Sequence, residues 1–130
     1  MSQDVASQLN AAYQRAKKAF WDADIVAYME LFAPELEYVR ADGSGFDYAQ
    51  MRLNVQVQMS RVRDMDGSSR RHSLAIDGDR ATEVWVQDAW TDFFSSTRWW
   101  RIRRTFRCHW AAKSNGWQIV RMEVLREKVT

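Results

Sequence analysis

The segment Trp99–Trp110, WWRIRRTFRCHW, holds four arginines, one histidine and four aromatic rings, with no carboxylate among them. In a β-strand, alternate residues face opposite sides, so the segment divides into two rows. The first row is apolar apart from one arginine: Trp100, Ile102, Arg104, Phe106, Cys108 and Trp110. The second row is basic: Trp99, Arg101, Arg103, Thr105, Arg107 and His109. This division predicts a strand whose apolar face covers a core or pocket, while most of its charge lies outside.

Three amphipathic helices are predicted in the first half of the chain. Apolar residues recur at spacings of three and four over residues 3–21, 25–32 and 47–66. Asp22 and Asp24 are candidate N-cap residues of the second helix and Pro34 its terminator, while Gly67 is the candidate terminator of the third.

Strands account for most of the remaining sequence. Alternating patterns bounded by turn residues predict strands over residues 36–40, 70–77, 80–94, 98–112 and 117–126. Short turns at Gly78-Asp79, Ser95–Thr97 and Asn115-Gly116 favour antiparallel neighbours. Helices gathered at the front and a long sheet behind predict an α+β domain in which a strongly curved sheet wraps the helices.

Size and composition indicate one globular domain over residues 1–130, with 46% hydrophobic and 28% charged residues. The single cysteine, Cys108, excludes an internal disulfide and is compatible with a reducing cytoplasm. No apolar run approaches the ~18 residues that a membrane helix needs. We therefore expect a cytoplasmic protein with no membrane partner.

The basic outer row is interpreted as a solvated or dimer-facing surface, in which arginines pair with acids and stack on Trp85 and Trp99. The net charge of only +2 gives little long-range attraction to a polyanion. A platform for single-stranded nucleic acid is the weaker alternative, because arginines interleaved with aromatic rings occur in such sheets.

One acid is expected to meet the arginine of the apolar row. The preceding strand divides into a more apolar row (Val84, Val86, Asp88, Trp90) and a mixed row (Glu83, Trp85, Gln87, Ala89). A turn centred on Ser96 places Asp88 opposite Arg104 on the concave face. Such a pair costs desolvation, so we infer that it is retained for ligand binding or catalysis, with a water-touching pair at the mouth of the fold as the alternative.

His72 and Tyr38 are the other candidate catalytic residues. His72 shares a row with Leu74 and Ile76, so it is expected to point inward as a general acid or base, or else to be a hydrogen-bonded core histidine. Tyr38, in the row of Leu36, is a candidate hydrogen-bond donor to a developing oxyanion.

The expected cavity wall is aromatic. Trp90, Trp100 and Trp110 would give a flat apolar surface for a ring-containing ligand, with Cys108 beside them as an unreactive thiol. In the last strand, either the row of Trp117, Ile119, Arg121 and Glu123 or the row of Val120, Met122 and Val124 faces the cavity. No motif for a metal ion, a nucleotide or another cofactor is present, so none is expected.

Three segments together resemble one known superfamily. They are AFWDADIVAYMELFAPELEYVRADGSG (19–45), RRHSLAIDGDRATEVWV (70–86) and NGWQIVRMEVL (115–125). They resemble the nuclear transport factor 2 (NTF2)-like superfamily, in particular its small bacterial SnoaL-like members. The resemblance implies a cystatin-like, cone-shaped α+β barrel of three helices within a curved sheet. It also implies a deep pocket and a homodimer through the outer sheet face.

The resemblance does not carry a known catalytic set onto this chain. Isomerase-type members have a tyrosine where this chain has Ala16, with Tyr13 one turn away. They have a general base where this chain has Arg40, and a second acid near Cys108. The epoxide-hydrolase pattern, an arginine and an aspartate two apart on one strand, corresponds here only to Asp88 and Arg104 on different strands.

The sequence thus predicts a pocket for a small hydrophobic, ring-containing ligand, with cofactor-free isomerase, cyclase or dehydratase chemistry left open. Asp88, His72 and Tyr38 are the candidate catalytic residues. The candidate ligand-binding residues are Arg104, Tyr13, Trp90, Trp100, Cys108 and Trp110. The alternative function is a non-catalytic dimerising or scaffold module of the same fold, which would have a closed, dry cavity.

Overall fold

The computed structural model describes residues 2–93 and 99–130, so the turn expected at Ser95–Thr97 lies outside the described residues. The helices are α1 (Ser2–Trp21), α2 (Ile25–Met29) and α3 (Tyr48–Arg61). The apolar stripe of α1 is buried as its spacing predicts, through Leu9, Ala12, Ala16 and Ala19.

Side-chain caps fix where the two shorter helices begin. Asp24 accepts a hydrogen bond from the backbone N–H of Ala27 at 3.1 Å and caps α2, as the sequence predicts. Asp47 caps α3 in the same way, accepting from the backbone N–H of Gln50 at 3.0 Å. These caps satisfy N–H groups that the first turn of each helix leaves unpaired.

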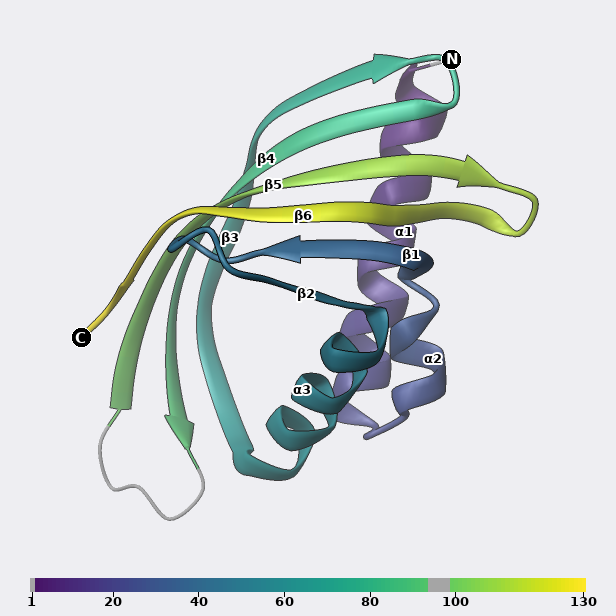
Figure 1. Ribbon diagram of the computed structural model, residues 1–130. Helices are drawn as coiled ribbons and strands as arrows, with labels where there is room; N and C mark the ends of the chain where they lie inside the picture. The colour runs from purple at the N-terminus through teal and green to yellow at the C-terminus, as the bar shows by residue number, and fades with distance from the viewer. Residues whose placement is uncertain (1, 94–98) are drawn as a thin grey trace.

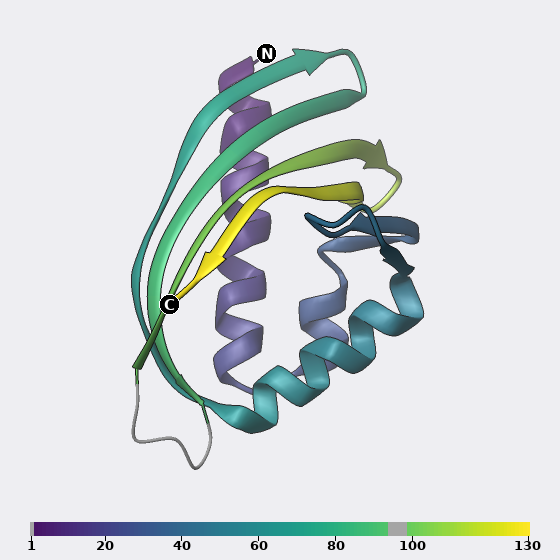
Figure 2. The ribbon, with the colours of Figure 1, turned by 60° about the vertical axis from the view of Figure 1, so that its left-hand side comes forward.

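Six strands form one curved sheet: β1 (Phe32–Val39), β2 (Gly45–Asp47), β3 (Val62–Asp77), β4 (Arg80–Phe93), β5 (Trp99–Lys113) and β6 (Gly116–Val129). Their order is β2-β1-β6-β5-β4-β3. The β1–β6 pair is parallel and the other neighbours are antiparallel. The sheet curls around one side on which all three helices lie (Figures 1 and 2). The predicted α+β class and strongly curved sheet are confirmed. The sheet is mixed and open, with β2 and β3 at its edges.

The junction between α3 and β3 differs from the sequence prediction. The helix ends at Arg61 and the strand begins at Val62, so Gly67 lies within β3 instead of terminating a helix. Gly67 pairs with Ala89 on β4, and a Cβ at Gly67 would come within 2.4 Å of the Ala89 Cα. The glycine therefore permits a close approach of two strands. Pro34, expected to end α2, lies inside β1.

The register of β4 against β5 is one residue away from the predicted one. Gln87 pairs with Arg104, and Asp88 pairs with Arg103. Because side chains alternate, this single step reverses the face of every β4 residue. The mixed row of Glu83, Trp85, Gln87 and Ala89 is therefore concave, and the row that contains Asp88 is on the outer face.

Bulges change the facing of residues in two other strands. His72 is the extra residue between the pairs Arg71–Trp85 and Ser73–Val84. Val120 and Leu125 are extra residues of β6 opposite β5. Each bulge switches which alternate residues face inward, so neither predicted row of β6 is concave along its whole length.

Candidate ligand cavity

A cavity of about 840 Å³ lies between the concave face of the sheet and the helices. This volume is in the range of pockets that hold small ligands, roughly 300–1,000 Å³. Most of its wall is apolar or aromatic, and the aromatic lining residues are Tyr13, Phe20, Trp21, Tyr28, Phe32, Tyr38, Phe46, Trp85 and Phe106. Exposed side chains of Lys17, Gln58 and Ser68 also line it, so the cavity opens to solvent.

Four polar side chains cross this wall in a continuous row, one on each of four adjacent strands. Ser69 pairs with Gln87, Gln87 with Arg104, and Arg104 with Glu127. All four line the cavity, and we call them the polar row. Apolar residues flank it on both sides: Ala89 and Ile102 on one side, and Trp85, Phe106 and Val124 on the other. The row therefore places polar groups at one level of an otherwise apolar wall.

An ion pair ends the polar row. The Nε–H of Arg104 donates to Oε2 of Glu127, and about a third of each side chain is exposed, 32% and 37%.

Tyr38 lines the same cavity and its ring stacks on Phe46, with centroids 4.4 Å apart. Burial raises the pKa of Tyr38, and the charge of Arg104 opposes part of that rise. Tyr38 consequently keeps its proton near neutral pH and can donate a hydrogen bond.

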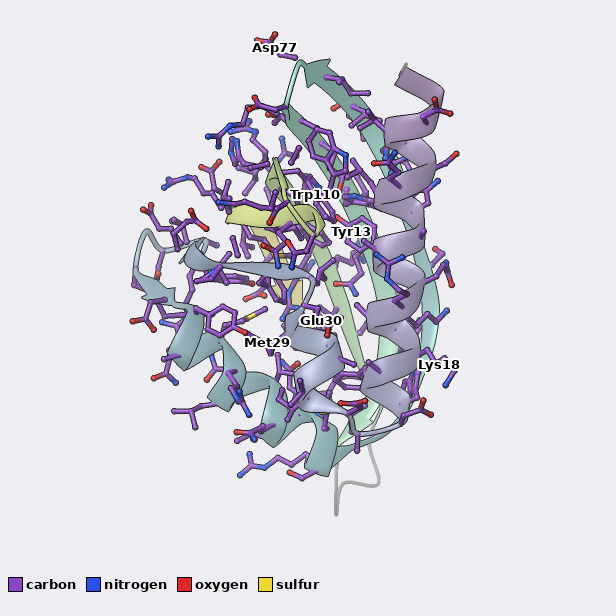
Figure 3. All side chains as sticks on the ribbon, turned by 90° about the vertical axis from the view of Figure 1, so that its right-hand side faces the viewer. Tyr13, Lys18, Met29, Glu30, Asp77 and Trp110 are labelled. Carbon is purple, nitrogen blue, oxygen red and sulfur yellow. The ribbon has the colours of Figure 1, made fainter. Side chains whose placement is uncertain are left out.

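A buried carboxylate joins α1 to the sheet beside the cavity. Glu83 is 0% exposed. Its Oε1 accepts from the Tyr13 hydroxyl and, at 2.7 Å, from the Trp110 indole N–H, and its Oε2 accepts from Arg71 Nε at 2.9 Å. Figure 3 shows Tyr13 reaching from α1 toward Trp110, and their rings meet edge to face at 5.3 Å. Tyr13, Arg71, Glu83 and Trp110 form what we call the buried tether.

Burial keeps the thiol and phenol of this region protonated. Burial raises the pKa of Cys108 to about 12, and it also raises the pKa of Tyr13 far above its ordinary value, with the negative charge of Glu83 adding to the effect. The Tyr13 oxygen lies 3.6 Å from the Cys108 sulfur. Cys108 is thus an inert thiol, as the sequence predicts.

Of the predicted ligand-binding residues, Tyr13 and Arg104 line the cavity, and so does the predicted catalytic residue Tyr38. Cys108 and Trp110 belong to the core next to it. Trp100 is half-buried and is not among the residues that line the cavity. The three tryptophans therefore do not form the flat wall that the sequence suggested.

Three predicted site residues lie on the outside. Asp88 is on the outer face, where both its oxygens accept from Arg101, at 2.9 and 2.7 Å. Trp90 is 44% exposed on the same face, with the Arg101 guanidinium 5.6 Å from its ring centre. His72 is exposed at its bulge. The Asp88–Arg104 pair and an inward His72 were therefore wrong, because one register step and one bulge reverse these side chains.

The outer face confirms that arginines pair with acids there. Besides Asp88–Arg101, Glu123 accepts from His109 at 2.7 Å and lies 3.6 Å from Arg107. The predicted stacking of outer-row arginines on Trp85 is wrong, because Trp85 faces the concave side. There the guanidinium of Arg71, on β3, lies 5.2 Å from the ring centre. The Trp99 side chain lies outside the described residues.

Sequence reasoning missed Gln87, Glu127 and the buried tether. Glu83 and Gln87 belong to the mixed row of β4, whose two polar residues suggest a solvent-facing surface. Glu127 follows the predicted end of its strand. The available signal was the pairing of Gln87 with Arg104 at the alternative register. Within residues 2–93 and 99–130, no three His, Cys, Asp or Glu side chains come together as metal ligands.

The sequence matches no family model. It also matches no curated protein. Solved structures do match, although at low identity. A conserved protein from Planctomyces limnophilus DSM 3776 superposes with a TM-score of 0.83 at 13% identity, over 95% of each chain. A putative scytalone dehydratase from Novosphingobium aromaticivorans DSM 12444 gives 0.78 at 13% identity, over 96% of this chain and 85% of that one.

An NTF2-like superfamily protein from Salmonella enterica gives a TM-score of 0.75 at 16% identity, over 95% of this chain and 92% of that one. The chain therefore has the NTF2-like, cystatin-like α+β fold that its sequence resembles. At these identities the likeness establishes the fold, and function has to be argued from the site. None of the described helices has the length and apolar character that a membrane crossing requires.

Proposed function

We propose that the protein binds a small, largely apolar, ring-containing molecule in the cavity and catalyses cofactor-free proton transfer on it. The observation that carries this proposal is the polar row, because it places an arginine, a carboxylate and a glutamine at one level of an aromatic cavity. A few convergent polar groups in an apolar pocket are typical of small-molecule sites. A scaffold module would not need an open cavity of this kind.

The roles follow from the chemistry of each group. Arg104 holds a ligand oxygen on which negative charge develops, and Tyr38 donates a second hydrogen bond to it. Glu127, held against Arg104, is the carboxylate that takes or returns the proton. This assignment replaces Asp88 and His72, which face away from the cavity. One structural neighbour is named a putative scytalone dehydratase, and a dehydration also requires removal of a proton from the substrate.

Ligand binding is tested by blocking the cavity. Gln87→Trp puts an indole into the polar row, whereas Val86→Trp puts the same group on the outer face of the same strand. In a thermal-shift screen of cyclic ketones, lactones and aromatic acids, we expect wild type and Val86→Trp to be stabilised by the same compounds. Gln87→Trp should respond to none of them. Equal responses of the two tryptophan variants would overturn the cavity assignment.

Proton transfer is tested without knowing the natural substrate. NMR follows exchange of the acidic α-protons of a bound cyclic ketone in D₂O. Wild type should accelerate the exchange, and Glu127→Gln should remove the acceleration while ketone binding persists. Tyr38→Phe should slow it by about 10²-fold, since a positioned donor to an oxyanion contributes on that order. Exchange that is unchanged in Glu127→Gln would remove its role as the base.

A further inference from the structure

The charges that line the cavity are unbalanced. Among the described lining residues, Lys17, Arg40 and Arg104 are cationic and Glu127 is the one acid, which gives three positive charges against one negative charge. Two acids lie just outside this lining: Glu83 is paired with Arg71 in the buried tether, and Asp42 is close enough to Arg40 for that charge to help lower the Asp42 pKa. The wall therefore presents a local excess of positive charge although the whole chain is nearly neutral.

Arg104 has unused hydrogen-bond donors. A guanidinium carries five N–H donors, and the bond from Nε to Glu127 is the one that the Arg104 side chain makes among the described residues. The N–H groups of its two terminal nitrogens are the fork that binds a carboxylate through two parallel hydrogen bonds. Gln87 lies directly opposite Arg104 on β4 and Ser69 lies beyond it on β3, which adds neutral donors along the same row.

Aromatic surface lies next to this fork. Phe106 is two residues from Arg104 on the same face of β5 and pairs with Trp85 on β4, and both rings line the cavity. A planar ring with one attached carboxylate would place its ring on these side chains and its charge at the polar row. A neutral ring compound would leave the terminal N–H groups of Arg104 without an anionic partner.

We propose that the ligand is a monoanionic ring compound, an aromatic or alicyclic carboxylate, and that Arg104 is its anchor. This inference rests on the proposed function and adds the substrate class to it. Glu127 forms an ion pair with Arg104, so its negative charge repels a carboxylate bound to the same guanidinium. The Glu127 carboxylate also serves as the base. Glu127→Gln should therefore tighten binding of a carboxylate even though it removes proton exchange, a combination that a merely structural ion pair does not produce.

The test compares 2-naphthoate with its neutral counterpart 2-naphthamide by isothermal titration calorimetry. Wild type should bind the acid at least about tenfold more tightly, since a charge-assisted hydrogen bond contributes roughly 1.5–3 kcal/mol. Arg104→Gln should lose this preference and keep its affinity for the amide. Arg103→Gln is the matched control, because it removes the neighbouring, exposed arginine from the outer face of the same strand.

Two further measurements keep the test decisive if Arg104→Gln does not fold. Arg104→Lys keeps the charge but lacks the two parallel N–H groups. Its preference for naphthoate over naphthamide should therefore lie between that of wild type and the absence of preference expected for Arg104→Gln. In wild type, raising salt from about 0.05 to 0.5 M should weaken naphthoate binding and leave naphthamide binding unchanged.

The two proposals fail in different ways. If naphthamide binds the cavity as tightly as naphthoate, or if Arg103→Gln and Arg104→Gln act alike, the carboxylate inference is overturned and the cavity function stands. If the thermal-shift screen finds no ring compound whose binding Gln87→Trp abolishes, the proposed function is overturned as well.

Discussion

Replacing Glu83 by glutamine tests the buried tether with the smallest change in shape. The amide oxygen of the new glutamine can still accept from Tyr13 and Trp110, but its NH₂ group would then face the Nε–H of Arg71, donor against donor. Breaking a buried ion pair costs about 3–5 kcal/mol. Arg71 keeps its hydrogen bond to Asn10 at 2.7 Å, and 21% of its side chain is exposed. We therefore expect a loss of unfolding free energy at the lower end of this range, about 3 kcal/mol.

Urea unfolding followed by tryptophan fluorescence measures this loss, and the melting temperature should fall by roughly 10–15 °C for a chain of this size. Glu127→Gln is the control, because it removes a carboxylate from a more exposed pair with Arg104 and should cost less than about 1 kcal/mol. Adding Arg71→Met to Glu83→Gln should recover part of the loss by removing the stranded cation. A Glu83→Gln protein as stable as the control would refute the tether.

Three further predictions concern single groups. Cys108 is 0% exposed and burial raises its pKa to about 12, so a thiol reagent at pH 8 should label it only after denaturation, and rapid labelling of the native protein would contradict its burial. Burial likewise raises the pKa of Tyr28 to about 12, so an ultraviolet titration at pH 11 should leave at least two tyrosines, Tyr13 and Tyr28, un-ionised until the protein unfolds, whereas ionisation of all tyrosines but one in the folded state would count against it. The hydrogen bonds from Arg101 hold the pKa of Asp88 below its ordinary value, so the pair stabilises the fold above that ordinary pKa and the stabilisation is lost as pH falls through the lowered one. Asp88→Asn should flatten the acid limb of the stability–pH curve and leave ligand affinity unchanged, and a loss of affinity would return Asp88 to the site.

The helices and the fold class could be predicted because their signals are local. The stripe of α1 repeats along most of the helix, and the cap of α2 needs only Asp24 and the residues directly after it. The two faces of β5 could also be separated, since Ile102, Cys108 and Trp110 form one strictly alternating row and all are buried. Each of these inferences depends on neighbours along the chain.

The site could be predicted only in part because it depends on how strands pair. The facing of Asp88 is set by the register of β4 against β5, and a shift of one residue reverses it. The composition of the two β4 rows does not show which of them is concave. The cavity wall contains polar residues such as Gln87, and the outer face contains the large apolar Trp90. The bulges at His72 and Val120 have no local sequence signal, so the inward rows of β3 and β6 could not be followed along their length.

The most direct test of the central claim is a crystal structure of the protein soaked with 2-naphthoate. We predict that the ring lies between Phe106 and Trp85 inside the cavity, with the carboxylate accepting from the terminal nitrogens of Arg104 beside Glu127. A ligand bound on the outer face against Trp90 and Arg101, or one inside the cavity with its carboxylate turned away from Arg104, would contradict this claim.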